Sequence, residues 1–343
     1  MVSLMKVLNI MLSRSLGGIQ QAFMDYENAL NLQGVEIINV TSIFAKINTS
    51  LSHSVNYKLA NLGPWDIFSI VYLKKIIKAT KPDFIIAHGN RAINFTRNFC
   101  FNSKIPLIGI AHNYTLKGLK KCDYIIALTS HMRSYLLDNN FKDYQIFIVP
   151  NMIDIKKDFN ISKKYRKPIV IGSLARFVPK KGINILLQSL AILRDQKYDF
   201  KAIIGGDGED KEKLLMLCRN LALENYVSFI GWVKDKDKFF NDIDIFCLPS
   251  LHEPFGIILL EAMEASIPIV STKSEGPNEI LRDKQDALLV DLGSAEDLAK
   301  HITLMIDNEA KARQFTHNSY LRLQECYNSD IIGAVLLSVM MQR

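Results

Sequence analysis

The residues Glu253 and Glu261 form an E-x7-E pattern inside the segment PSLHEPFGIILLEA. Glu253 follows an expected strand that ends at Pro249, and a helix is expected to begin near Gly256. Glu261 then lies about a turn and a half into that helix, so both carboxylates can reach the same edge of a sheet. Carboxylates accept hydrogen bonds from sugar hydroxyls well. Taken alone, the pair is equally explained by a helix cap and a surface glutamate.

Two basic residues, Arg176 and Lys181, lie upstream between an expected strand at 169–174 and a helix that begins at Ile183. The start of a helix carries a partial positive charge, and cations beside it suit an anionic group. Guanidinium and ammonium groups bind phosphate oxygens through charged hydrogen bonds. The pattern therefore indicates a diphosphate site, and two solvated surface charges are its simpler explanation.

Glycines occur in two further loops that follow expected strands. Gly17 and Gly18 precede a helix, where a glycine allows close approach of a ligand and the helix start favours an anion. Gly205, Gly206 and Gly208 resemble half of a dinucleotide fingerprint, but Lys211 replaces its third glycine. A nicotinamide site is therefore not expected, and a turn that admits a nucleotide is the better interpretation.

Short apolar runs alternate with helical patterns along most of the chain, which is typical of parallel sheets covered on both faces. In the first half, helices are expected at 19–32 and 65–80. The expected strands of the two halves are 6–12, 35–40, 84–87, 107–111, 124–128, 146–149, and then 169–174, 201–204, 227–230, 245–248, 269–271, 287–290. The fold class is therefore α/β.

The polar, lysine-rich stretch 151–167 marks the expected boundary between two doubly wound, Rossmann-like domains. We assign residues 1–160, together with the C-terminal helix 329–343, to the first domain, and residues 161–328 to the second. The two domains are expected to face each other across a cleft. Ligands of such sheets bind at the carboxyl ends of the strands, so the loops after the strands should carry the function.

Composition narrows the function classes. Residues 1–167 hold 22 Lys and Arg against 10 Asp and Glu, whereas residues 168–343 hold 20 against 25. The basic half suits an anionic acceptor or an anionic membrane surface. Nucleic acid is not expected, because no nucleic-acid-binding motif accompanies the charge. Scattered cysteines and the lack of an apolar run of roughly 18 residues predict a cytoplasmic protein without disulfides, a structural zinc site or a membrane span.

Together, these motifs resemble the retaining nucleotide-sugar glycosyltransferases of family 4, which have the GT-B fold. Gly17-Gly18, His112, the Arg176 to Gly182 loop, the E-x7-E pattern and the segment Glu275 to Glu279 fall in the order of that family. The resemblance covers nearly the whole chain and is strongest over residues 168–292. It also implies that the last helix crosses back onto the first domain.

The resemblance implies a role for each motif of the second half. Arg176 and Lys181 would contact the diphosphate of the donor, Glu253 the donor sugar, and Glu261 the ribose. The backbone amides of Phe255, Gly256 and Ile257 would donate to sugar or phosphate, and the base would lie near Val233. The turn at Gly208 is expected to bind the donor as well.

In the first half, the resemblance implies that Gly17 and Gly18 close on the phosphates and that His112 meets the donor sugar near the reacting carbon. His88 follows a neighbouring strand and is expected on the acceptor side. Two D-x-D patterns begin at Asp235 and Asp242, but helix capping and a buried strand explain them, so neither a metal nor another cofactor is predicted.

We therefore predict a metal-independent, retaining glycosyltransferase that acts on a glycan, lipid-linked or lipopolysaccharide-type acceptor of the bacterial cell envelope. The stretch 65–81 interleaves apolar residues with four lysines, so a peripheral contact with the inner face of the cytoplasmic membrane is a further expectation. An ordinary helix with a solvated lysine side explains that stretch as well. Two alternatives remain: a nucleotide-sugar epimerase of the same fold, and a non-catalytic relative that binds a membrane or a partner.

Overall fold

A computed structural model describes residues 4–14, 17–49, 55–63, 66–99, 104–160 and 164–342. The chain divides into two compact units. Unit 1 holds residues 1–154 and 327–343, and unit 2 holds residues 155–326. The first division falls inside the polar stretch 151–167, six residues before the boundary assigned from the sequence.

Unit 1 contains a parallel sheet whose described strands have the order β3-β2-β1-β4-β5-β6-β7. The chain runs outward from β1 to β3 and then returns to the other side of β1 with β4, so the direction of winding switches between β1 and β4. The strands are β1 Lys6–Met11, β2 Glu36–Ser42, β3 Val55–Leu59, β4 Phe84–His88, β5 Leu107–Ala111, β6 Tyr124–Ala127 and β7 Ile146–Ile148.

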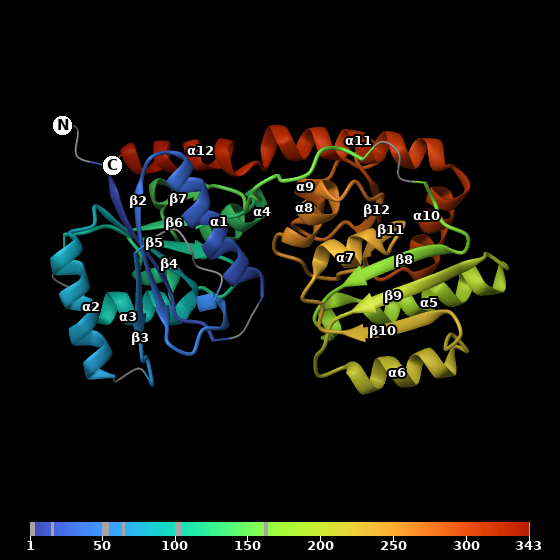
Figure 1. The fold of residues 1–343 in the computed structure, drawn as a ribbon, viewed down its shortest axis with the longest axis horizontal. Coiled ribbons are helices and arrows are strands. Elements are labelled where there is room, and N and C mark those ends of the chain that lie inside the picture. Colours follow the sequence, from blue (N-terminus) through green and yellow to red (C-terminus); the bar gives the residue numbers. More distant parts are fainter. Residues whose placement is uncertain are drawn as a thin grey trace. The chain divides into compact units, whose positions relative to one another are not determined.

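Helices connect these strands and cover the sheet (Figure 1). Helix α2 begins at the cap Asp66, whose side chain accepts the amide of Ser69 at 3.0 Å, and ends at Lys81 in the left-handed conformation. Its apolar residues recur every three or four positions and are buried on one side. The helices of unit 1 are α1 Gly18–Leu32, α2 Ile67–Thr80, α3 Gly89–Phe99, α4 Ser130–Asp138 and α12 Ser329–Met341.

The C-terminal helix α12 belongs to unit 1, as the resemblance implied. It packs against α1, and Gly333 allows the close approach, because a Cβ atom there would lie 2.3 Å from the carbonyl oxygen of Ala29. Gln33 of the α1 end also donates to the side chain of Asp330 at 2.9 Å. One face of the apolar tail is thereby buried, while Ile331 and Val335 on the other face stay exposed.

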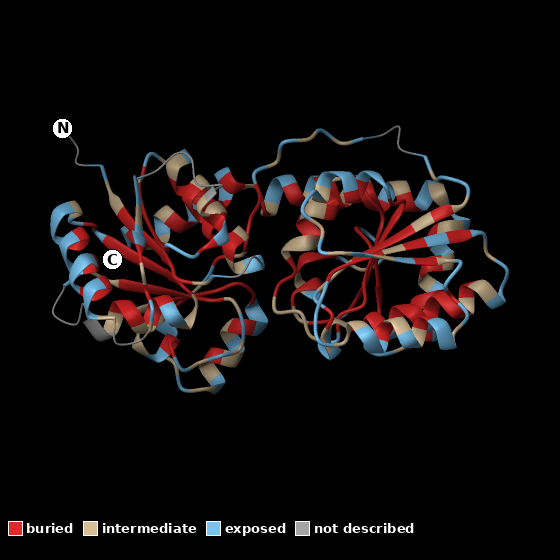
Figure 2. Ribbon diagram, turned by 60° about the horizontal axis from the view of Figure 1, so that its bottom comes forward, coloured by how far each residue is buried: buried red, intermediate tan, exposed pale blue. Residues whose placement is uncertain are grey.

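Unit 2 repeats the same winding in a second parallel sheet of order β10-β9-β8-β11-β12-β13. Its direction switches between β8 and β11. Figure 2 shows the buried strands inside each unit, with the helices half-buried around them. The strands are β8 Ile169–Leu174, β9 Phe200–Gly205, β10 Val227–Gly231, β11 Ile245–Leu248, β12 Ile269–Thr272 and β13 Leu288–Val290.

The helices of unit 2 follow the same rules. Helix α5 buries nearly every apolar residue of INILLQSLAILRD, and α10 begins at Ser294, whose hydroxyl accepts the amide of Asp297. The helices are α5 Ile183–Asp195, α6 Lys211–Asn220, α7 Lys236–Asn241, α8 Ile257–Glu264, α9 Pro277–Ile280, α10 Ala295–Asp307 and α11 Glu309–Cys326.

The α/β class and the expected strands are confirmed, with boundaries that differ by one or two residues. Strand β3 was missed, because its sequence VNYKL is exposed at the sheet edge and shows no apolar run. The expected helix 65–80 is α2, which begins at Ile67, and Trp65 lies outside the described residues. Cys122, Cys218 and Cys247 are buried free thiols, whereas Cys100 is outside the described residues.

Candidate functional site

The loops after β8 and β11 meet at the point where the winding of the unit 2 sheet switches direction. Such a switch leaves room outside the carboxyl ends of two adjacent strands, which is where α/β sheets bind ligands. Gly182 permits the contact between the two loops: its φ is +64°, and a Cβ atom there would lie 2.0 Å from the carbonyl oxygen of Pro249. The amide of Leu251 also donates to the carbonyl of Lys180 at 2.9 Å.

At this point Lys181 and Glu253 form an ion pair between the ammonium nitrogen Nζ and the carboxylate oxygen Oε2. Both side chains are largely buried, with 13% and 12% of their surface exposed. The hydroxyl of Ser250 lies 3.5 Å from the same carboxylate oxygen. The two residues that the sequence assigned to phosphate and sugar are therefore direct neighbours.

The loop that carries Glu253 is fixed by the loop after β12. Glu275 accepts the backbone amide of Glu253 at 3.0 Å and contacts the ring nitrogen Nδ1 of His252 at 2.5 Å. Burial alone would raise the pKa of Glu275, but the hydrogen bonds from its own amide, from Glu253 and from His252 lower it below its usual range. Glu275 thus remains a carboxylate that holds the loop in place.

Helix α8 begins at the site and carries the second glutamate. Gly256 precedes it with a φ of +97°, a conformation that favours glycine, and the side chain of Phe255 is buried beside it. Glu261 Oε1 lies 2.5 Å from the ammonium of Lys236, which is the first residue of α7. Its other oxygen, Oε2, is buried and has no hydrogen-bond partner among the described residues.

Burial raises the pKa of Glu261, and the Lys236 ammonium partly opposes this effect. A buried carboxylate oxygen without a partner costs free energy, on the order of 1–3 kcal/mol. A ligand hydroxyl that reached Oε2 would recover that cost. The geometry therefore suits a hydroxyl-bearing ligand at Glu261.

Arg176 lies in the loop directly after β8, and its side chain is exposed. Its guanidinium forms no hydrogen bond or ion pair with any residue that the structure describes. A charged group that no carboxylate neutralises is available to an anion. The two cations of this loop thus differ: Arg176 has no ion-pair partner among the described residues, whereas Lys181 is paired with Glu253.

The glycine loop after β9 packs directly on the loop that carries Arg176. A Cβ atom at Gly206 would lie 1.8 Å from the carbonyl oxygen of Ala175, and one at Gly208 would lie 2.4 Å from that of Phe177. Both glycines are therefore required by the packing of these loops. The loop after β10 lies beside them and carries Trp232, which is 47% exposed, and Val233.

In unit 1 the expected residues also follow strands. Gly17 precedes α1 and Gly18 is its first residue, at the end of the sheet where the winding switches. His112 directly follows β5, and burial lowers its pKa to about 4. Its ring nitrogen Nε2 lies 3.2 Å from Nδ1 of His88.

His88 is only 2% exposed, at the last position of β4. The rings of Phe23 and Tyr26 lie edge-on to it, and Asn9 contacts its other ring nitrogen. The expectation that His88 lines the acceptor side is corrected on this point: the ring is enclosed by protein, and its ring nitrogens contact Asn9 and His112.

The two D-x-D patterns have structural roles. Asp235 caps α7 by accepting the amide of Lys238 at 2.9 Å, as expected, and Asp237 pairs with Lys157 at 2.6 Å. Asp244 is buried before β11 and accepts the amide of Val170 at 2.7 Å. Within the described ranges, no group of three or more His, Cys, Asp or Glu side chains is placed to hold a metal ion.

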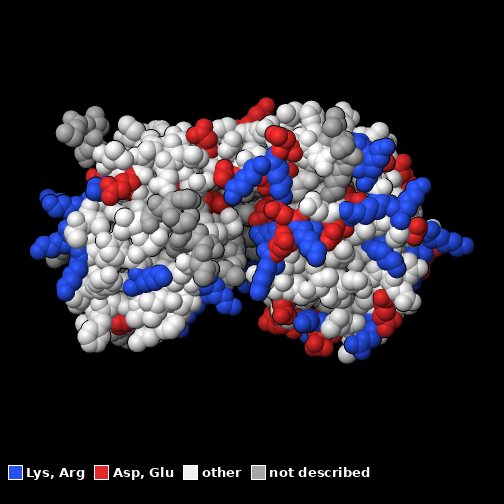
Figure 3. Space-filling model, viewed as in Figure 1, with Lys and Arg blue, Asp and Glu red and all other residues white. Residues whose placement is uncertain are grey.

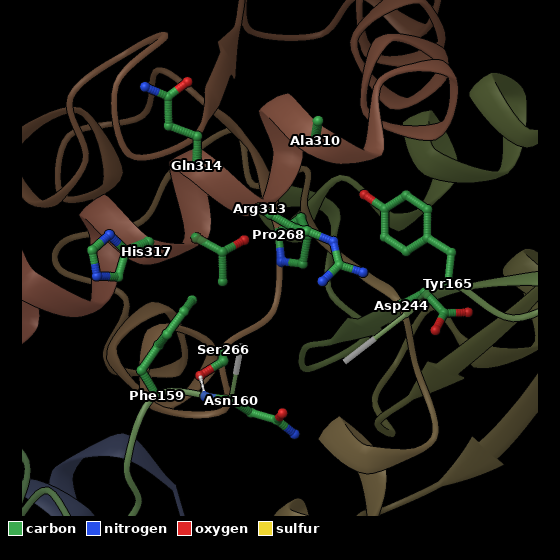
Figure 4. A pocket seen from close by; sticks show the side chains of 11 residues that line it. Phe159, Asn160, Tyr165, Asp244, Ser266, Pro268, Ala310, Arg313, Gln314 and His317 are labelled. Atoms are coloured by element: carbon green, nitrogen blue, oxygen red, sulfur yellow. Dashed lines mark hydrogen bonds between the residues drawn. The ribbon is translucent and has the colours of Figure 1, made fainter. Parts of the chain in front are cut away.

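A pocket of about 330 Å³ lies elsewhere in unit 2, between the residues Phe159, Asn160 and Tyr165, the loop before β12 and helix α11 (Figure 4). Asp244, which lines it, precedes β11, whereas Glu253 follows that strand. The pocket therefore lies at the amino ends of the strands, whereas the ion pair of Lys181 and Glu253 lies at their carboxyl ends. Polar and apolar side chains both border it, its exposed surface is mainly apolar, and the hydroxyl of Ser266 accepts the amide of Asn160 at 3.0 Å.

Two Rossmann-like units, one with paired charges at the switch point of its sheet, define a two-domain α/β protein. Comparison with known proteins identifies the family. Residues 154–322 match the family described as Glycosyl transferases group 1, and residues 16–157 match Glycosyltransferase Family 4. The chain belongs to these glycosyltransferases, which have the GT-B fold.

One curated relative and two solved structures illustrate the similarity in sequence and in fold. The lipopolysaccharide core biosynthesis glycosyltransferase LpsE of Rhizobium meliloti is 29% identical over 305 residues, which cover 87% of this chain and 88% of that protein. The structure of Anabaena HepE with UDP-glucose superposes with a TM-score of 0.85 at 20% identity, over 99% of this chain and all of the other. The lipopolysaccharide outer core galactosyltransferase WaaB superposes with a TM-score of 0.76 at 18% identity, over 98% of each chain.

Sequence reasoning missed three residues around the site. Lys236 pairs with Glu261, His252 pairs with Glu275, and Asn9 contacts His88. The sequence does not distinguish Lys236 as a site residue, since it is one of several lysines in a surface stretch. Asn9 did give one: it is a polar residue inside the apolar run of a buried strand, where an amide must have specific partners.

No helix among the described residues is long and apolar enough to cross a membrane.

Proposed function

We propose that this glycosyltransferase moves a sugar from a nucleoside diphosphate donor to a glycan or glycolipid acceptor, with retention of configuration and without a metal. The observation that carries the proposal is the meeting of Lys181 and Glu253 at the switch point of unit 2, with Arg176 in the same loop as Lys181. A cation for the diphosphate lies there next to a carboxylate for the sugar.

The two cations supply the electrostatic part of catalysis. When the bond from the anomeric carbon to the diphosphate oxygen breaks, its electron pair stays on that oxygen and negative charge accumulates. Arg176 and Lys181, aimed at the diphosphate, stabilise this charge more in the transition state than in the ground state. The acceptor oxygen forms the new bond to the anomeric carbon, and its proton passes to the departing phosphate.

Donor binding rearranges an ion pair that exists beforehand. In this structure Lys181 neutralises Glu253, so neither side chain is left as a buried, uncompensated charge. A sugar diphosphate offers a phosphate oxygen to the ammonium and hydroxyl donors to the carboxylate. Both charges then keep partners throughout, which makes the exchange energetically accessible.

The remainder of the donor follows the neighbouring strands. Glu261 accepts ribose hydroxyls at its unpartnered oxygen Oε2, and the backbone amides of Phe255, Gly256 and Ile257 face sugar or phosphate at the start of α8. The base lies by the exposed loop of Trp232 and Val233 after β10.

The descriptions of two similar proteins support the proposed class of acceptor. LpsE is described as a lipopolysaccharide core enzyme and WaaB as an outer core galactosyltransferase, which favours a cell-envelope acceptor for this chain.

The fixed cations of unit 2, Arg176 and Lys181, neutralise a diphosphate as a divalent ion would. Transfer that persists unchanged in EDTA supports metal independence, whereas loss that Mg²⁺ or Mn²⁺ restores contradicts it.

The central test compares Lys181→Ala with Lys180→Ala. Lys180 is the exposed neighbour whose side chain has no described partner, so its variant should leave transfer unchanged. Lys181→Ala should lower kcat by about 100- to 1000-fold, as expected for removing one preorganised donor. A donor screen with purified protein and product analysis gives the rates. Equal rates in both variants contradict the assignment, and conversion of the donor without an acceptor indicates the epimerase instead.

We further propose that unit 1 contacts an anionic membrane surface through α2. Four apolar side chains in the first half of this helix are exposed: Ile67 68%, Phe68 88%, Val71 47% and Tyr72 44%. Lys74, Lys75 and Lys78 follow on the same exposed side, and lysines gather over α2 in Figure 3. An apolar face beside lysines matches the acyl boundary and anionic headgroups of a bilayer.

Vesicle sedimentation tests this contact. Phe68→Ser should reduce binding to vesicles with phosphatidylglycerol several-fold, and uncharged phosphatidylcholine vesicles should bind weakly. Met216→Ser is the matched control, since Met216 is 61% exposed on α6 of unit 2. Binding that is equal for the two variants, or independent of anionic lipid, contradicts the proposal.

A further inference from the structure

A chain of polar contacts runs through the core of unit 1 and ends at His112. Asn9 is in the middle of strand β1 and is 1% exposed, and His88 ends the adjacent strand β4 and is 2% exposed. Asn9 Oδ1 lies 3.0 Å from Nε2 of His88, and Nδ1 of His88 lies 3.2 Å from Nε2 of His112. Three polar side chains, from the neighbouring strands β1 and β4 and from the residue after β5, thus contact one another in turn.

The orientation of the Asn9 amide follows from its other contacts. Its nitrogen Nδ2 lies 3.2 Å from the carbonyl oxygen of Phe23 and 3.1 Å from Oδ1 of Asn39. A backbone carbonyl can only accept a hydrogen bond, so the atom that faces Phe23 must be the amide nitrogen. The amide oxygen therefore faces His88.

This orientation fixes the protons on both imidazoles. An amide oxygen only accepts, so Nε2 of His88 must carry a proton. His88 is buried, and burial holds its pKa well below the ordinary value, so the ring is neutral and Nδ1 has no proton. Nδ1 of His88 is then an acceptor, and Nε2 of His112 must donate to it. A neutral His112 is left with an unprotonated Nδ1.

We infer that Asn9 and His88 are positioning residues that hold His112 in the Nε2–H tautomer, so that its Nδ1 is presented as a hydrogen-bond acceptor for a hydroxyl of the sugar substrates. The part that concerns substrate rests on the proposed function. The described part of the chain supplies no partner for Nδ1 of His112. The rings of Phe23 and Tyr26, with centroids 5.4 and 5.2 Å from that of His88, hold its plane.

The tautomer is observable without any ligand. Long-range ¹H–¹⁵N spectra of protein labelled at histidine should show Nε2–H tautomers for both His88 and His112 at neutral pH. His88→Asn places an amide oxygen near the position of Nδ1 and should keep the His112 tautomer, whereas His88→Phe removes the acceptor and should release it to a mixture. An Nδ1–H tautomer of His112 in the unaltered protein overturns the inference.

Kinetics test the consequence for catalysis. With a nucleotide sugar that the unaltered enzyme turns over, His88→Phe should lower kcat by about 100-fold, as misplacement of a reacting group does, with a smaller change in donor KM. His88→Asn should recover most of this loss, and the control His131→Asn, an exposed histidine of α4, should change nothing. Equal kcat for His88→Phe and the unaltered enzyme contradicts the positioning role.

The two tests separate this inference from the proposed function. If no nucleotide sugar is turned over, the proposed function fails while the spectra still decide the tautomer. If transfer occurs but His112 is an Nδ1–H tautomer, the positioning inference fails while the proposed function stands.

Discussion

Both glutamates that we expect to bind the donor are held by lysines in this structure. Glu253 pairs with Lys181, and Glu261 pairs with Lys236. Ion pairs of this kind avoid a buried, uncompensated carboxylate before the ligand arrives. Oxygen Oε2 of Glu261 is buried and has no hydrogen-bond partner among the described residues, and it is the atom that we assign to the ribose.

The ribose assignment makes a prediction about donors. A donor that lacks the ribose hydroxyls should bind the unaltered enzyme about 10- to 100-fold more weakly, because a hydrogen bond to a charged group contributes about 1.5–3 kcal/mol. Glu261→Ala should bind ribose and deoxyribose donors equally. Calorimetric titration measures both, and Glu212→Ala, at an exposed position of α6, is the control. A preference for ribose that survives in Glu261→Ala removes the assignment.

At the scale of elements, α12 completes unit 1 by packing on α1. The contact depends on one small residue, since a side chain at Gly333 would meet the backbone of Ala29. A β-bridge between Ile153 and Asn328 precedes α12. It joins the two segments of unit 1, residues 1–154 and 327–343, where each adjoins unit 2 in the sequence. The end of the chain is therefore a structural part of its first unit.

Gly333→Val should destabilise unit 1 by about 1–3 kcal/mol, the usual cost of overpacking. Ala334→Val is the matched control, because the next residue of α12 is exposed and the substitution places the same β-branched side chain in the same helix. Urea denaturation should show a lower midpoint for Gly333→Val only. Equal midpoints would mean that α12 does not pack as described.

At the scale of the whole molecule, acid should act on the two units differently. His88 and His112 are both in unit 1 and face Asn9, Phe23 and Tyr26 rather than a carboxylate. Burial lowers both pKa values, that of His112 from 6.5 to about 4. The unfolded chain therefore binds more protons below pH 6.5 than the folded chain does, and the free energy of unfolding of unit 1 falls as the pH falls.

The expected loss is up to about 1.4 kcal/mol per pH unit for each histidine between pH 6.5 and the folded pKa. Hydrogen exchange followed by mass spectrometry at pH 7.0 and 5.5, corrected for intrinsic rates, should show weaker protection at the lower pH in β1, β4 and β5 and little change in β8 and β11. In His112→Asn this loss should be smaller. Protection in unit 1 that is independent of pH would contradict the prediction.

Much of the fold and part of the site were predictable from local patterns. Apolar runs fixed the strands, and the order of glycines, cations and glutamates after them indicated donor-binding loops and the family. Lys181 and Glu253 could be named, because each has a recognisable position after a strand. Strand β3 was missed for the opposite reason, since an exposed edge strand lacks the apolar signal.

Local patterns in the sequence show which residue types follow each strand, because periodicity and turn chemistry depend on neighbouring residues. Their partners follow from the folded arrangement: Lys181 with Glu253, Lys236 with Glu261, and Asn9 with His88 and through it with His112. These pairs join residues from different strands, loops and helices, and their contacts depend on which strands are adjacent. Burial, which placed His88 inside the core and left an oxygen of Glu261 without a partner, likewise arises only when the sheets and helices pack.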